Sequence, residues 1–189
     1  MKTILCVLCI ALAACPAALA EVRQADESSG TLEFTALQAG AKFTGAFKGF
    51  QVRLDFDPSD ATHGCLDVTV ATPSIDTQDA ERDEILRGQD FFWTEKFPQA
   101  VFHAEHFEPD GAGFRAQGEL TIRGATKPAE VRFTLAPAPS AAVMKGTASL
   151  RRLAFGLGQG DWASTEWVGD EVEVRFELKL KPAAAATIS

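Results

Sequence analysis

The chain contains 189 residues, 46% of them hydrophobic, and its formal net charge at pH 7 is −8. This length corresponds to one domain with room for a sizeable core. The acidic balance repels polyanions, and no cluster of Lys and Arg interleaved with aromatic residues occurs in the sequence, so both features argue against nucleic-acid binding.

Residues 1–20 predict a secretory signal peptide. Lys2 precedes an apolar run from Ile4 to Ala14, and the small residues Ala18-Leu19-Ala20 form a cleavage site. The run is too short to cross a bilayer, which requires roughly 20 apolar residues. We therefore expect an exported protein whose folded domain spans residues 21–181.

The cysteines leave a second interpretation of the N-terminal segment open. Leu12-Ala13-Ala14-Cys15 resembles a bacterial lipobox, in which Cys15 would carry a lipid anchor. Pro16, directly after this cysteine, and the later cleavage site favour ordinary processing. Cys65 is the one cysteine beyond the signal segment, so we expect no internal disulfide and a small, buried, apolar role for this residue.

From residue 31 onward the hydrophobic pattern has a period of two, which predicts β-strands with one dry face and one wet face. Clean alternation favours antiparallel pairing, because parallel strands covered on both faces show continuous apolar runs. The alternation is regular in residues 52–57, 66–70, 114–123, 131–135 and 171–180, and weaker in residues 31–37, 41–48, 99–107 and 143–155.

These segments predict an all-β fold, with about eight strands closed into an antiparallel barrel. Closure removes exposed strand edges and encloses an interior that can hold one small ligand. A two-sheet sandwich has the same alternation and stays open as an alternative. Residues 182–189 show no period, and we expect a disordered tail there.

Residues 76–88 break the alternation and predict one short helix across an end of the barrel. Asp76 or Thr77 can cap its first turn, Arg87 falls in its last turn, and Gly88 can close it. The apolar segment Phe91-Phe92-Trp93 follows. It is either a plug of core residues or a rim that contacts a ligand, because both roles reward the same burial.

Candidate metal ligands are few. His103 and His106 are three positions apart, which on a regular strand places them on opposite faces, so without a bulge they cannot share an ion. His63 lies far from both in the sequence. We therefore expect no metal site and no other cofactor.

Enzymatic motifs are also weak. Residues 156–160 contain three glycines, but a strand pattern follows them where a phosphate-binding loop requires a helix. The acidic residues Glu81, Asp83 and Glu84 are explained by the dipole at the start of the predicted helix. No serine lies in a Gly-x-Ser-x-Gly elbow. We expect a binding protein and not an enzyme.

Several motifs together resemble one known family. They are Ser74-Ile75-Asp76-Thr77, Arg82-Asp83-Glu84-Ile85-Leu86, Asp90-Phe91-Phe92, Lys96-Phe97-Pro98, Val101-Phe102, the hairpin from Gly118 to Pro128, and Phe155-Gly156. Over residues 31–181 the chain is similar to the YceI-like family of periplasmic lipid- or polyisoprenoid-binding proteins. A departure occurs at His103, Glu105 and His106, where the family has small residues and lysine.

The resemblance implies an extended lipocalin-like barrel with a lengthwise apolar pore, a periplasmic location, and no cofactor. Its ligands would be isoprenoid lipids such as polyprenyl phosphates or quinones, with transient membrane contact. The residues expected to line the pore, taken as a set, are Phe43, Phe47, Val52, Leu54, Phe56, Val68, Val70, Phe91, Phe92, Trp93, Phe102, Leu120, Ile122, Phe133, Leu150, Phe155, Val174 and Phe176.

Two other functions stay open at this point. The protein could be an accessory module of a membrane electron-transfer system that acts through a bound quinone, or a barrel isomerase or cyclase built around a buried acid. The inward positions of the predicted strands offer almost no polar group for the latter. The sequence does not distinguish a monomer from a homodimer.

Overall fold

The computed structural model describes residues 22–61, 64–138 and 140–183. The predicted signal peptide, Cys15, His63 and the last six residues of the predicted tail lie outside the described residues. Among the residues described, no helix is long and apolar enough to cross a membrane.

Strands dominate the chain, and most of them lie where the alternation predicted them. β1, which is short, was not predicted. The strands are β1 (Arg23–Asp26), β2 (Gly30–Gln38), β3 (Ala41–Phe47), β4 (Phe50–Phe56), β5 (Gly64–Ala71), β6 (Ile75–Asp76), β7 (Gln99–Asp110), β8 (Gly113–Ile122), β9 (Ala125–Ala138), β10 (Ala141–Arg151) and β11 (Glu171–Pro182).

The helical elements are short. They are one α-helix, α1 (Ala80–Arg87), and four 3-10 turns, η1 (Glu27–Ser29), η2 (Thr72–Ser74), η3 (Arg152–Phe155) and η4 (Gly160–Ala163). Residues 152–155, predicted as the end of a strand, form η3 instead. β11 extends to Pro182, and the Ala183 amide donates to the Val22 carbonyl at 2.8 Å, so ordered pairing continues into the segment predicted as a tail.

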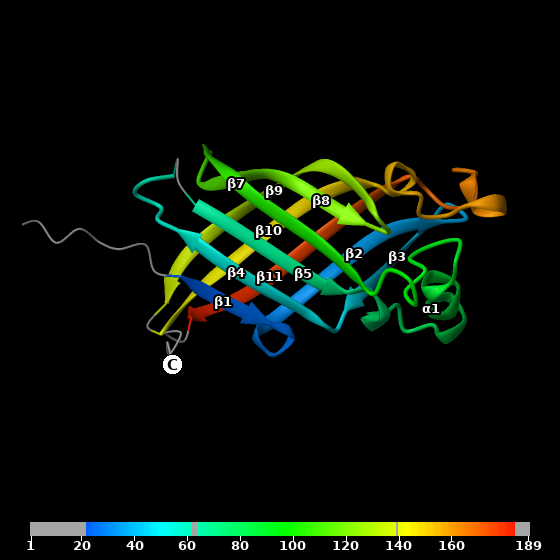
Figure 1. Ribbon diagram of the computed structural model, residues 1–189, viewed down its shortest axis with the longest axis horizontal. Coiled ribbons are helices and arrows are strands. Elements are labelled where there is room, and N and C mark those ends of the chain that lie inside the picture. The colour runs from blue at the N-terminus through cyan, green and yellow to red at the C-terminus, as the bar shows by residue number, and fades with distance from the viewer. Residues whose placement is uncertain (1–21, 62–63, 139, 184–189) are drawn as a thin grey trace, which may run out of the picture.

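The sheet closes on itself. All strand pairs are antiparallel, and the order runs β1-β4-β5-β7-β8-β9-β10-β11, after which β11 returns to β1 through Arg23↔Pro182. β2 continues β1 beyond η1, and β3 precedes β4 on the neighbouring line, so the ring has eight positions. The predicted eight-stranded barrel with one short helix is confirmed, and the sandwich is excluded (Figure 1).

The barrel wall follows the alternation of the sequence closely. In β4, Phe50, Val52 and Leu54 are buried while Gln51 and Arg53 are exposed. One row of side chains therefore faces the lumen and the other faces solvent. Because each strand adds its own apolar row, the lumen is apolar along its length.

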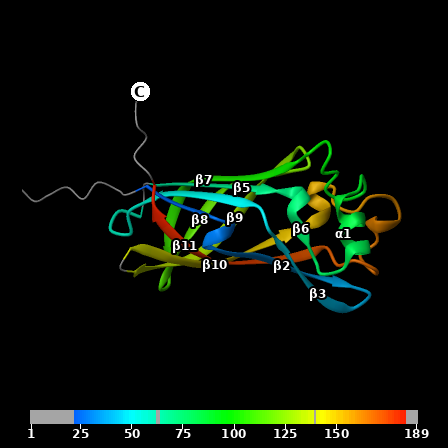
Figure 2. The same ribbon diagram turned by 90° about the horizontal axis from the view of Figure 1, so that it is seen from below.

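α1 lies at one end of the barrel, and the start of β1 and the end of β11 lie at the other (Figures 1 and 2). The helix begins one turn later than predicted, because the Asp79 carboxylate accepts the Arg82 amide at 3.1 Å. Asp76 instead accepts the Gln78 amide at 2.9 Å in a turn before the helix. Gly88 closes the helix as predicted, donating to the carbonyls of Glu84 and Ile85.

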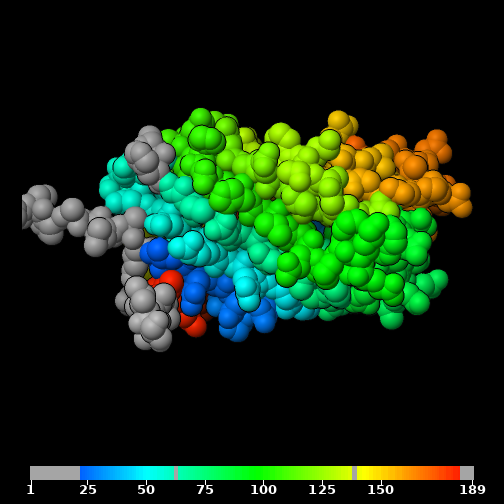
Figure 3. All heavy atoms as spheres, in the orientation of Figure 1, coloured from blue at the N-terminus to red at the C-terminus, as the bar shows by residue number. Residues whose placement is uncertain are grey.

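The loop containing η3 and η4 packs against the segment that follows α1, and together they cover this end (Figure 3). The amides of Gly158 and Gln159 both donate to the Asp90 carbonyl, at 2.7 and 3.0 Å. Arg123, in the turn between β8 and β9, donates to the carbonyls of Gly156 and Gln89 at 2.6 Å each. The glycine-rich loop therefore packs against protein and opens no α-helix. The strand expected directly after it is absent, because the 3-10 turn η4 begins at Gly160 and the next strand, β11, begins only at Glu171.

Candidate ligand cavity

A cavity of about 210 Å³ occupies the half of the barrel nearest α1. Its roof is formed by residues of α1 and the two covering segments, including Leu86, Phe91 and Leu157. Its floor includes Leu66 and Met144, each only 1% exposed. Of the thirty described residues that line it, all are apolar except Arg152.

Most residues predicted to line the pore border this cavity. Many of them, such as Val68 and Leu150, are only partly buried, because their surface faces the hollow interior instead of other side chains. Whether they contact lipid stays a prediction. The fourteen are Phe43, Phe47, Val52, Val68, Val70, Phe91, Phe92, Phe102, Leu120, Ile122, Leu150, Phe155, Val174 and Phe176.

Three predicted lining residues, Leu54, Phe56 and Phe133, do not border the cavity. They face inward as predicted, but they lie beyond its floor in a packed cluster. The ring of Phe56 stacks on Phe107 at 4.9 Å and meets Phe114 at 4.8 Å and Phe133 at 5.8 Å, centroid to centroid. These rings fill the lumen at the end opposite α1, so the predicted lengthwise pore is closed there by an aromatic plug.

Trp93, the fourth predicted lining residue outside this group, does not border the cavity either. Its φ of +46° lies in the left-handed region, which non-glycine residues rarely adopt. Its ring lies 5.9 Å from Phe97, and Lys96 Nζ stands 4.3 Å above it. The side chain of Trp93 therefore packs on Phe97 and Lys96, and the side chains of Phe91 and Phe92 are the two of this segment that face the cavity.

Phe91 and Phe92 combine the two roles that the sequence left open. Phe91 is buried and packs on Trp162 at 5.7 Å, while Phe92 meets Phe47 edge to face at 5.8 Å. Both also border the cavity. They therefore act as the packed roof of the barrel and as part of its inner lining.

Sequence analysis missed several lining residues. Phe34 lies within the predicted segment 31–37, and Phe50 lies two residues before the segment 52–57. Following the alternation through both segments would have found them. Arg152 carried no such signal, because an arginine at a strand end is usually exposed. Its position in the cavity wall depends on η3 and on the loop that returns over it.

Arg152 is 4% exposed, and carbonyl groups satisfy its guanidinium. Nε donates to Gly169 at 2.9 Å, Nη1 to Leu157 at 2.8 Å and Nη2 to Val168 at 2.7 Å. Burial lowers the pKa of Arg152 from its usual value, although an arginine remains protonated at neutral pH. The hydrogen bonds of this side chain thus hold the covering loop in place. They also place one positive charge at the wall of an apolar cavity.

A second, more polar hollow of about 310 Å³ adjoins the cavity beside α1. It shares Phe43, Leu86, Phe91 and Val168 with the cavity wall. Its polar side is centred on Arg82. We call this hollow the vestibule.

Arg82 organises the polar side of the vestibule. Its Nε donates to Gln38 Oε1 at 3.1 Å, its Nη2 lies 3.3 Å from Asp79 Oδ2, and its guanidinium stands 4.6 Å over the ring of Phe43. A charged group is thus held at the edge of an apolar space. This arrangement can accommodate a molecule with a polar end and an apolar body.

Among the residues that the structure describes, no histidine or carboxylate borders the cavity, whereas Asp79 and Glu81 border the vestibule. The buried carboxylate of α1, Asp83, accepts the amide and the hydroxyl of Thr77 at 2.8 and 2.7 Å. Its position is explained by these local hydrogen bonds, which fix the chain before the helix.

A closed antiparallel barrel around an apolar cavity, with a polar vestibule at one end, defines the class of barrel proteins that enclose a small ligand. Residues 24–180 match the YceI-like domain model, and the chain belongs to the YceI-like family. The resemblance inferred from the motifs is thereby confirmed.

Relatives agree in sequence and in fold. Protein YceI of Escherichia coli O17:K52:H18 is 40% identical over 137 residues, which cover 71% of this chain and 60% of that relative. The match thus spans less than two thirds of the relative's length. The crystal structure of Burkholderia cenocepacia BcnA is 30% identical, covers 82% of this chain and 98% of its own, and superposes with a TM-score of 0.78.

A polyisoprenoid binding domain from Saccharophagus degradans shares the fold. It is 13% identical, and the match covers 87% of this chain and 99% of that domain with a TM-score of 0.64. This likeness concerns the architecture alone.

Proposed function

We propose that the protein binds a long apolar isoprenoid lipid, of the polyprenyl phosphate or quinone type, inside the barrel. The observation that carries the proposal is the cavity of about 210 Å³ whose described lining is apolar except at Arg152. The description of the Saccharophagus degradans neighbour as polyisoprenoid-binding supports the same ligand class.

The aromatic plug gives the lipid a direction. Because Phe56, Phe107 and Phe133 fill the far end, we expect a chain to enter at the end that carries α1, through the vestibule and past the segments that cover the cavity. The tail would then lie in the cavity, and the polar end would remain near the vestibule and Arg82. Cationic groups such as a guanidinium bind phosphate readily, which fits a polyprenyl phosphate.

Affinity would depend on fit and on the polar end. Each buried methylene contributes about 0.8 kcal/mol relative to water, but the competitor of this protein is a bilayer, where the same chain is already buried. Most of the hydrophobic gain therefore cancels in the exchange. Shape complementarity to the phenylalanine-rich wall and contacts at the vestibule would therefore decide how the lipid distributes between the protein and the bilayer.

We also propose that the protein is exported to the periplasm and meets membranes transiently. Trp167 is 64% exposed and Leu37 is 41% exposed. Their segments are joined by hydrogen bonds from the Ala39 amide to the Trp167 carbonyl at 2.7 Å and from the Gly169 amide to the Leu37 carbonyl at 3.0 Å. Trp at such a position suits a water–membrane interface.

Binding without catalysis is the role that we propose, because the described wall offers no pair of acid and base groups. The test begins with organic extraction of the protein as purified from cells that export it, followed by mass spectrometry. An isoprenoid lipid should be recovered in near-equal molar amount. Recovery of no apolar molecule, together with failure to take up undecaprenyl phosphate or ubiquinone from micelles, would refute the proposal.

A matched pair of variants locates the binding. Ala148 borders the cavity, and its neighbour Thr147 is exposed on the same strand. Ala148→Phe adds an aromatic ring to the space and should reduce lipid recovery severely. Thr147→Phe adds the same ring on the outer face and should leave recovery unchanged.

A further inference from the structure

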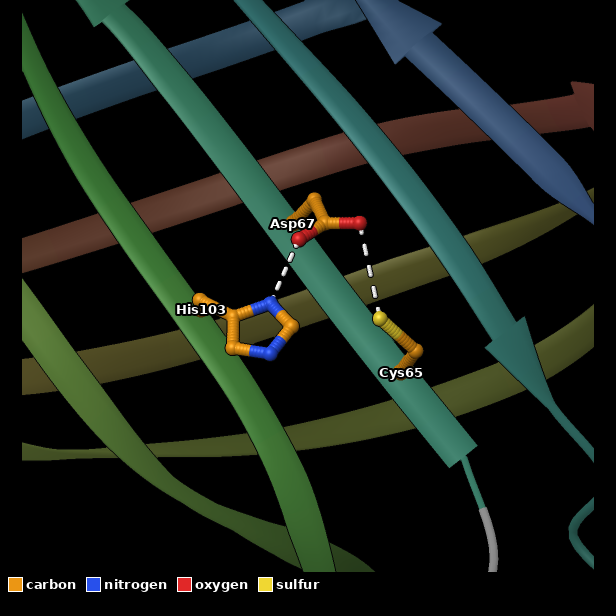
Figure 4. A group of neighbouring side chains, drawn as sticks. All are labelled: Cys65, Asp67 and His103. Carbon is orange, nitrogen blue, oxygen red and sulfur yellow. Dashed lines mark hydrogen bonds and ion pairs between the residues drawn. The ribbon is translucent and has the colours of Figure 1, made fainter.

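A cluster of three different ligand types lies on the outer wall of the barrel, away from the cavity. Cys65 and Asp67 are two residues apart on β5, so both point outward from the same face. Asp67 stands opposite His103 of β7 in the register. Figure 4 shows the Asp67 carboxylate between the other two side chains, with one oxygen toward each.

The ligand atoms of the three side chains already lie about as close together as they would around a bound metal ion. Asp67 Oδ1 lies 2.7 Å from His103 Nδ1, and Asp67 Oδ2 lies 3.4 Å from Cys65 Sγ. The ligand atoms of all three residues fall within 4.8 Å of one another. Around a tetrahedral Zn²⁺, with bonds of about 2.0 to 2.3 Å, neighbouring ligand atoms stand roughly 3 to 4 Å apart.

A fourth residue, Glu105, lies where its carboxylate can accept a hydrogen bond from the histidine of the cluster. The register of β7 against β8 shifts between Ala104 and His106, so Glu105 is the extra residue of a β-bulge. Its Oε1 lies 3.4 Å from His103 Nε2. Metal-binding histidines usually donate their second ring N–H to a carboxylate, which orients the ring and strengthens the ligand.

The bulge is the exception that the expectation for the two histidines left open. His103 and His106 are both exposed, whereas a regular strand would place them on opposite faces. Cys65 also differs from the expectation, because it is half-buried on the outer wall and not part of the core. Its location beside Asp67 follows from their spacing on β5, whereas the approach of His103 depends on the pairing of β5 with β7, which no local pattern reveals.

We propose that Cys65, Asp67 and His103 form a binding site for a divalent transition-metal ion, with Zn²⁺ as the best match. Thiolate, imidazole and carboxylate are the donors that Zn²⁺ uses, and a set that includes a thiolate is unsuited to Mg²⁺ or Ca²⁺. Three protein ligands leave a fourth position for water or an external ligand. Binding displaces the thiol proton of Cys65 and the proton shared by Asp67 and His103.

The charged side chains around the cluster favour a bound cation on balance. Asp55 of β4 stands opposite Cys65 and Glu119 of β8 stands opposite His103 in the register, and Glu105 adds a further carboxylate. Arg53 opposes the cation, with Nη1 3.9 Å from Asp67 Oδ2. Its side chain is 58% exposed, so it can swing into solvent when an ion binds.

The cluster is not arranged as a reactive thiol. Partial burial, and then the hydrogen bond with Asp67, raise the pKa of the Cys65 thiol. Reactive cysteines have the opposite shift, produced by neighbouring cations. A bound metal ion reverses this situation, since coordination removes the thiol proton outright.

The test is titration of the full-length, reduced chain with Zn²⁺ by calorimetry and with Co²⁺ by absorbance. One ion should bind per chain, and the Co²⁺ complex should show a thiolate-to-metal charge-transfer band. Cys65→Ser should abolish the band and weaken binding at least tenfold. Glu105→Gln should weaken binding by about 10- to 100-fold, the usual loss for such an outer partner, and Arg53→Gln should strengthen it.

Two controls separate this site from others on the chain. His106→Ala removes an exposed histidine of the same strand and should leave binding unchanged. A chain with Cys6, Cys9 and Cys15 replaced by serine should bind as the unaltered chain does. A Co²⁺ band that persists in Cys65→Ser, or identical Zn²⁺ affinity in that variant, would overturn the proposal.

A measurement on the unaltered protein completes the test. Zn²⁺ should slow the alkylation of Cys65 by iodoacetamide at least tenfold, and a chelator should restore the original rate. An alkylation rate that does not respond to Zn²⁺ would also overturn the proposal. Neither the metal titration nor the alkylation rate depends on lipid, so the test of this site is independent of the ligand proposed for the barrel.

Discussion

Arg152 Nη2 donates to the carbonyl oxygen of Val168 across 2.7 Å, at the boundary of an otherwise apolar cavity. The two residues are separated by the whole covering loop, which contains η4. The same guanidinium also satisfies the carbonyls of Leu157 and Gly169. One buried cation therefore supplies the polar contacts that let this loop close the barrel end.

Arg152→Met should destabilise the protein by about 2 to 4 kcal/mol, because it leaves buried carbonyl groups without donors. Chemical denaturation measured by circular dichroism gives this free energy. Arg151→Met is the matched control: its side chain is 81% exposed and pairs with Asp170 at 3.0 Å. Loss of such an exposed pair should cost less than about 1 kcal/mol. Equal effects of the two variants would contradict the role assigned to Arg152.

Phe176→Asp should sharply reduce uptake of undecaprenyl phosphate in the folded protein. Phe176 borders the cavity, and an unpaired charge in an apolar space is strongly disfavoured. Glu177→Ala is the control on the next residue, where the exposed carboxylate pairs with Lys145 at 2.9 Å. It should leave uptake unchanged and alter stability by no more than about 0.5 kcal/mol. Unchanged uptake in folded Phe176→Asp would remove this residue from the ligand path.

If Phe176→Asp does not fold, Phe176→Leu tests the same position with a milder change. The smaller side chain preserves apolar character while changing the shape of the wall. Uptake should then shift in favour of bulkier isoprenoid chains. No change in chain preference would argue against contact between Phe176 and lipid.

Phe56→Ala should cost about 3 to 5 kcal/mol of stability, the usual loss for removing a buried aromatic ring. Phe56 is buried among Phe107, Phe114 and Phe133. Because the plug lies beyond the cavity floor, lipid uptake by the folded fraction should persist and extend to longer chains. Thermal unfolding and uptake of prenyl chains of graded length measure the two effects. Gln51→Ala, on the exposed face of the same strand, should change neither.

Stability at low pH should depend on Asp26, which caps η1. The hydroxyls of Ser28 and Ser29 donate to its carboxylate at 2.6 and 3.0 Å and lower its pKa below the usual value of 3.8. Its stabilisation is therefore present above that value and is lost as pH falls through the lower, folded-state pKa. Asp26→Asn should flatten the pH dependence of the denaturation midpoint in this acidic range. Parallel pH profiles for the two proteins would contradict the assignment.

The alternation of residues was enough to predict antiparallel strands and the face of most side chains, whereas the choice between a barrel and a sandwich required the closure of β11 onto β1. Val174 and Phe176 point inward because every second residue of β11 must lie on the same side of the sheet. The helix was also readable, since acids at its start and Gly88 at its end are local signals. Only its first turn was misplaced, because Asp76, Thr77 and Asp79 are all suitable caps, and Asp79 is the one that accepts a hydrogen bond from the helix.

A period of two predicts whether a side chain faces the lumen or the solvent. It carries no information on where that side chain lies along the barrel axis. Val68 and Phe56 therefore look alike in the sequence, although one borders the cavity and the other belongs to the plug. Tertiary structure alone decided that difference, since it depends on how rings from several strands fill one level of the lumen. It also brought Asp67 beside His103, because the pairing of β5 with β7 is set by barrel closure and not by any local preference of either strand.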